Sequence, residues 1–78
     1  MSENTQVEAK VLVTKEIAEA LPSRPDWMRE CVTQAESSMN EIASERHRHV
    51  SARPEFTDAR DTRLGYVELT FVAPTEAD

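Results

Sequence analysis

The side chains with the greatest chemical potential lie in one run of five residues, ERHRH, from Glu45 to His49. Imidazole and carboxylate groups are common zinc ligands, so a metal site is the first hypothesis to consider. On a helix, Glu45 and His49 lie four positions apart and share a face, whereas in an extended segment His47 and His49 would share one. A structural zinc site takes four ligands and a catalytic site takes three. The chain has no third histidine and Cys31 lies several turns away, so the sequence predicts no metal site.

The other reactive residues do not form a catalytic pattern. Cys31 is the only cysteine and has no sequence signature of an activated nucleophile, so we expect a buried structural thiol. Gly65 is the only glycine, which excludes phosphate-binding loops and nucleophile elbows, because both need several. Asp58 and Asp61 are three residues apart in a polar segment with no apolar surroundings that would suit one of them for acid catalysis. We therefore expect a protein that is not an enzyme and carries no cofactor.

Arginine is concentrated in the middle and C-terminal part of the chain. Its guanidinium group suits bidentate contacts with carboxylates or phosphates, so these arginines and the solvent face of the helix before them are candidate partner-binding residues. The candidate set comprises Arg46, Arg48, Arg53, Arg60, Arg63 and Glu41. A local alternative applies to the first arginines, since positive side chains in the last turns of a helix complement the negative end of its dipole.

Alternating apolar residues predict a strand over residues 5–14. The apolar side chains fall on every second position: Val7, Ala9, Val11 and Val13. Thr14 is then a suitable cap for a short helical turn over residues 15–21, which Pro22 ends.

A long amphipathic helix is predicted over residues 24–50. Ser23 and Asp26 have the spacing of a capping box, and Pro25 is allowed in the first turn. The following apolar side chains recur at steps of four and three: Met28, Val32, Ala35, Met39 and Ile42. This stripe either packs against a sheet or, because the spacing suits a coiled coil, pairs with a second helix. Trp27 beside it belongs either to the core or to an interface.

The chain is predicted to end in a second strand. Residues 51–62 mix proline with scattered charge, which indicates an irregular loop held by Phe56. Residues 63–73 predict a strand because apolar and polar positions alternate, and Pro74 closes it. Residues 1–4 and 74–78 have no periodic pattern, so we expect disordered tails around a single domain of residues 5–73.

Together these elements predict a small α+β domain in which a two-stranded sheet packs against one long helix. The sequence leaves open whether the strands are parallel or antiparallel. Two strands alone are rarely stable and leave two exposed edges. We therefore expect self-association as a homodimer, in which two copies complete a four-stranded sheet across the dimer axis.

Composition narrows the setting in which the protein acts. The net charge of −6, from 15 acidic and 9 basic residues, disfavours a nucleic-acid binder that neutralises phosphates. No stretch approaches the ~20 apolar residues that span a bilayer, and a single cysteine cannot form an internal disulfide. We expect a cytoplasmic protein without membrane contact. Seven arginines against two lysines, with frequent alanine, are typical of GC-rich genomes, and in composition the chain is similar to small accessory proteins of actinobacteria or their phages.

Among function classes, the sequence favours a small non-enzymatic protein–protein interaction module, such as a phage or mobile-element accessory protein. It would dock on a protein partner through its helix face and its arginine-rich segment. The alternative is an acidic inhibitor or decoy that occupies a nucleic-acid site on a host enzyme, and steep salt dependence of binding would favour it. A small-molecule site at a dimer interface is a third hypothesis.

Overall fold

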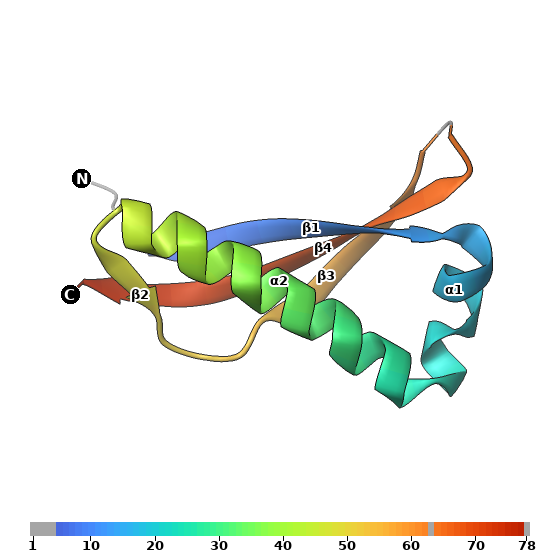
Figure 1. The fold of residues 1–78 in the computed structure, drawn as a ribbon, viewed down its shortest axis with the longest axis horizontal. Helices are drawn as coiled ribbons and strands as arrows, with labels where there is room; N and C mark the ends of the chain where they lie inside the picture. The colour runs from blue at the N-terminus through green and yellow to red at the C-terminus, as the bar shows by residue number, and fades with distance from the viewer. Residues whose placement is uncertain (1–4, 63, 78) are drawn as a thin grey trace.

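A computed structural model describes residues 5–62 and 64–77 and shows an α+β fold with two helices, a short 3₁₀ turn and four strands (Figure 1). In chain order the elements are β1 (Gln6–Thr14), α1 (Lys15–Ala20), the 3₁₀ turn η1 (Leu21–Ser23), α2 (Pro25–Glu45), β2 (Arg48–Val50), β3 (Glu55–Asp61) and β4 (Tyr66–Ala77). The predicted fold class is therefore confirmed. No helix in the described residues is long and apolar enough to cross a membrane.

The strands form one antiparallel sheet with β4 in its middle. Along one side, β1 pairs with β4 from Gln6 opposite Pro74 to Thr14 opposite Tyr66. The other side of β4 is shared, because β2 pairs with its C-terminal end and β3 with its N-terminal half. The prediction of a two-stranded sheet was wrong: one chain supplies all four strands and does not need a second copy to complete them. The reason is that β2 has only three residues and β3 is polar throughout most of its length, so neither shows alternating hydrophobicity.

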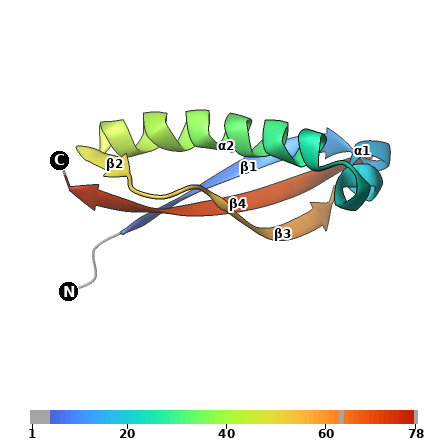
Figure 2. The same ribbon diagram turned by 90° about the horizontal axis from the view of Figure 1, so that it is seen from below.

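The core lies between α2 and one face of the sheet, with the helix forming the second layer of the molecule (Figure 2). The predicted stripe of α2 packs against the sheet, where Cys31, Ala35 and Met39 are buried. Trp27, Met28, Val32 and Ile42 are partly buried against the same cluster. The strands contribute the alternating residues of β1 and β4, namely Val7, Ala9, Val11, Val67, Leu69, Phe71 and Ala73.

The start of each helix follows local rules, with one correction. Thr14 caps α1 as expected, and its hydroxyl accepts a hydrogen bond from the backbone N–H of Ile17 at 3.2 Å. The predicted capping box before α2 is absent, because Ser23 belongs to η1 and Arg24 is the cap residue without a side-chain cap bond. The Arg24 guanidinium instead lies 4.2 Å from the centroid of the Trp27 ring, a cation–π contact.

The helix α2 ends at Glu45 instead of at the predicted residue 50. His47 adopts a left-handed backbone conformation with φ of 57°, and the N–H groups of Arg46 and His47 donate to the carbonyls of Ala43 and Ser44. A residue in this conformation ends a helix because it turns the chain out of the helical path. Glycine is the usual residue there, so the sequence carried no signal for this end.

The C-terminal strand continues well beyond Pro74. Residues 74–77, predicted as a tail, form the end of β4, and Thr75 is buried. Proline fits here because its nitrogen faces the gap between β2 and β3, where no ladder bond is required, while its carbonyl accepts from Ser51 N–H at 3.0 Å. The strand begins at Tyr66, and the predicted strand start at residue 63 and the predicted tail at residues 1–4 and 78 lie outside the described residues.

Candidate protein-binding surface

The strand β3 forms the margin of the sheet on the side away from β1, and all seven of its residues are exposed. Figure 2 shows β3 on the side of β4 away from α2. Among the described residues its only strand partner is β4. An exposed outer strand offers backbone N–H and C=O groups with which another chain can pair, so β3 is a candidate docking edge.

The direction of the β3 backbone groups follows from a single bond at the turn. Thr62 N–H donates to the carbonyl of Tyr66 at 2.9 Å, so Tyr66 and every second residue of β4 after it direct their backbone groups towards β3. Arg60 lies opposite Glu68 in this register, so its backbone N–H and C=O groups point towards β4. Ala59 and Asp61, which alternate with it, therefore direct their N–H and C=O groups to the outer edge.

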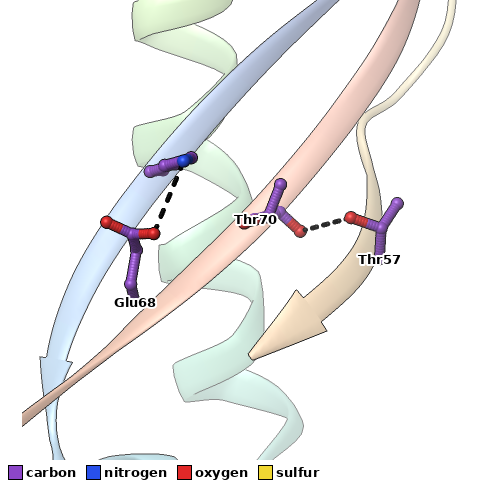
Figure 3. A network of polar contacts seen from close by, with 4 residues as sticks. Thr57, Glu68 and Thr70 are labelled. Carbon is purple, nitrogen blue, oxygen red and sulfur yellow. Dashed lines mark hydrogen bonds and ion pairs between the residues drawn. The ribbon is translucent and has the colours of Figure 1, made fainter. Parts of the chain in front are cut away.

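Phe56 is the apolar feature of this edge. Its side chain is 46% exposed, while its ring meets the fully buried ring of Phe71 edge-to-face, with 5.8 Å between centroids. One side of the ring packs on Phe71 of the core, and the other side is exposed. A register shift follows Phe56, and the hydroxyl of Thr57 donates to the carbonyl of Thr70 at 3.2 Å (Figure 3), which holds the bulge in place.

The face of the sheet away from α2 carries a row of charge beside β3. Lys10 of β1 and Glu68 of β4 form an ion pair at 3.5 Å (Figure 3), and Arg60 of β3 lies opposite Glu68 in register. Both side chains of the ion pair are partly exposed, so it contributes little to stability.

The structure does not bring the candidate arginines together. Arg46 is the cap residue that follows α2, Arg48 lies in β2, Arg53 in the loop before β3 and Arg60 in β3, while Arg63 lies outside the described residues. Arg48 is opposite Ala77 and Arg60 opposite Glu68, positions on β4 that are separated by about 30 Å at the rise of a strand. Glu41 lies on the exposed face of α2. The arginine-rich segment thus spans the molecule, and its role in partner binding stays a prediction.

Arg48 has an internal role. Its Nε donates to Thr75 Oγ1 at 2.8 Å and its Nη2 to the Thr75 carbonyl at 3.0 Å. These bonds satisfy a buried threonine and join β2 to the end of β4.

A second exposed apolar group was not anticipated from the sequence. Leu12 is 61% exposed, Tyr66 46% and Leu64, in the turn before β4, 82%. Leu12 pairs with Glu68 in register, so Tyr66 is its diagonal neighbour on the sheet face away from α2. The sequence could have shown this, because Leu12 and Tyr66 lie at even-numbered positions of their strands, whereas the buried valines lie at odd-numbered positions and point to the other face.

Cys31 is buried, as predicted. Burial raises the pKa of its thiol, and the carboxylate of Glu30 raises it further. A raised thiol pKa opposes formation of the reactive thiolate. In residues 5–62 and 64–77, no cluster of three or more histidine, cysteine or acidic side chains could hold a metal ion.

No family model, curated protein or solved structure matches the chain. The assignment of a function therefore depends on the geometry of the surface.

Proposed function

We propose that this chain is a non-enzymatic protein-binding module that docks an extended segment of a partner protein along the outer edge of β3. The observation that carries the proposal is the strand itself: all seven of its residues are exposed at the sheet margin, and Phe56 near its start packs on Phe71 while remaining 46% exposed. Addition of a strand to an open sheet edge is a common mode of peptide recognition, in which backbone bonds supply affinity and side-chain sites supply specificity.

The side chains of β3 indicate the chemistry of the partner. In register, Phe56 and Ala59 share the face of Phe71 and Leu69, whereas Glu55 and Asp58 lie on the opposite face. Three acidic residues and one arginine make the strand acidic. A complementary segment is extended, with apolar side chains on one face and basic side chains on the other. Arg53 and Arg60 are the members of the predicted arginine set that lie next to or within this edge.

The test uses a proline that blocks the edge. The N–H group of Ala59 faces outwards, so Ala59→Pro removes a donor that β3 does not share with β4. Tagged wild-type protein and this variant are used to capture proteins from lysates of the source organism and its host, with quantification by mass spectrometry. We expect one stoichiometric partner whose capture falls by about tenfold or more in the variant, because a backbone bond is lost and the ring holds the strands apart.

Leu64→Ala is the matched control, because it removes an exposed apolar side chain outside β3. It is expected to retain the partner, and thermal unfolding shows whether Ala59→Pro remains folded. Equal capture by both variants would contradict docking at β3.

The decoy hypothesis has one specific support in the structure. Glu30, Glu41 and Glu45 are exposed on α2, so the helix presents negative charge in its first half and near its C-terminal end. In the same capture experiment this function would yield a nucleic-acid enzyme that is retained by Ala59→Pro and released by salt or by added nucleic acid.

A further inference from the structure

We propose that β1 pairs antiparallel with β1 of a second copy of this chain, centred on Ala9, so that two four-stranded sheets join into one continuous sheet. This inference concerns the sheet margin opposite β3 and does not depend on the proposed partner. In the part of the chain that the structure describes, β4 is the only strand that pairs with β1. In Figure 1 the middle of β1 lies above β4 and β3, and β4 crosses it towards its C-terminal end.

The backbone of β1 fixes which residues can pair with another strand. Thr75 N–H donates to the carbonyl of Thr5 at 2.7 Å. Odd-numbered positions of β1 therefore exchange bonds with β4, and Glu8, Lys10 and Leu12 direct their N–H and C=O groups to the outer edge. A two-fold pairing centred on Ala9 places Glu8 opposite Lys10 of the second copy, where each pair exchanges two backbone bonds.

The charges of β1 select this register. Centred on Ala9, the strand sets the Glu8 carboxylate against the Lys10 ammonium of the second copy, and two-fold symmetry repeats the contact. A shift that centres the pairing on Glu8 places two glutamates opposite each other, and a shift to Lys10 does so with two lysines, so both are repulsive. Glu68 already contacts Lys10 at 3.5 Å, so the dimer extends this pair into a row of alternating charge across the joined sheets.

The faces of the strand are consistent with the same register. Val7 falls opposite Val11 of the second copy and Ala9 opposite itself, so the buried faces of the two copies are continuous. A register shifted by a single residue would set the apolar face of one copy beside the polar face of the other. On the outer face, the exposed Leu12 falls opposite Gln6 of the second copy.

The opposite edge has charges that oppose self-pairing. β3 carries three acidic residues against one arginine, so two copies of it would bring together strands of the same net charge, and the register shift between Phe56 and Asp58 interrupts the regular ladder. The charges of β1 balance each other when it pairs with its own copy, whereas those of β3 do not.

The experiment is a charge exchange measured by sedimentation equilibrium from micromolar to millimolar concentration. The chain has a mass of 8.8 kDa, and wild type is expected to reach twice this mass. Glu8→Lys places two lysines opposite each other, and Lys10→Glu does the same with two glutamates. Each variant should weaken the dimer by about tenfold or more, because every substitution acts twice across the symmetry axis.

Mixing the two variants restores the attraction, since β1 of the Glu8→Lys protein carries only positive charge at these two positions and β1 of the Lys10→Glu protein only negative charge. Native mass spectrometry of the mixture is expected to show a heterodimer. Glu55→Lys, the same charge change on β3, is the control and should leave the dimer intact, while circular dichroism of each variant confirms that the monomer is folded. A wild-type monomer at every concentration overturns the proposal, as does a dimer that neither single variant weakens.

Discussion

The Arg48 side chain joins β2 to the C-terminal end of β4. Its guanidinium group satisfies both the hydroxyl and the carbonyl of Thr75, which is 6% exposed. The planar fork of arginine suits two acceptors that lie close together on one residue. Since β2 has only three residues, these two bonds add to the short ladder that joins it to β4.

Replacement of Arg48 by alanine is expected to lower the free energy of unfolding by about 1–3 kcal/mol, because it leaves the Thr75 hydroxyl buried without its donor. Urea denaturation of wild type and variant measures the difference. Arg53→Ala is the matched control, since Arg53 is exposed in a loop, and it should change stability by no more than about 0.5 kcal/mol. If both variants lost equal stability, the Thr75 bonds would not be the cause.

At the scale of the element, the C-terminus of α2 depends on an unfavourable backbone conformation. His47 follows the cap residue with φ of 57°, a region that costs most side chains energy and glycine almost none. This position reverses the chain from α2 into β2 within two residues.

His47→Gly is therefore expected to raise the free energy of unfolding by about 0.5–1 kcal/mol, because it relieves the left-handed conformation of a residue with a Cβ atom. The control is His49→Gly, two residues later in β2, where glycine should destabilise the strand by a similar amount. Thermal unfolding of the two variants gives the sign directly. A loss of stability in both would show that the His47 side chain makes a contact worth more than the strain.

The elements that the sequence predicted are those with a long periodic pattern. β1, α2 and most of β4 bury alternate or every third and fourth residue, so burial is visible in the order of apolar side chains. β3 buries no residue and is formed by its ladder with β4, which local sequence cannot show. The end of α2 was also not predicted, because the residue in the left-handed conformation is a histidine instead of the usual glycine.

The candidate site was predictable only in part. The sequence named Arg53 and Arg60 as candidate partner-binding residues, but it predicted the segment around Phe56 as an irregular loop, whereas that segment forms the outer strand β3. The sequence grouped Arg46, Arg48 and Arg60 because they are near one another in sequence, whereas β2 and β3 pair with opposite ends of the same long strand. Proximity in space was set by the register on β4, which is a long-range property of the fold.

At the scale of the whole molecule, stability depends on a single thin core. The molecule measures 40 × 26 × 18 Å, a thickness that accommodates one sheet and one helix. The largest fully buried side chains are Phe71, Met39 and Leu69. A chain of this length has a free energy of unfolding of only about 4–12 kcal/mol. The burial of any one of these side chains therefore contributes a large share of it.

Phe71→Ala tests this dependence, because Phe71 lies in the central strand and is also the ring against which Phe56 packs. We expect a loss of about 3–5 kcal/mol, enough to populate the unfolded state measurably at ambient temperature, with collapse of the near-ultraviolet signal of Trp27. Leu64→Ala removes an aliphatic side chain that is 82% exposed and should leave the spectrum and the urea midpoint unchanged. A cooperative transition for Phe71→Ala at the wild-type midpoint would mean that the two layers are held together elsewhere than at this ring.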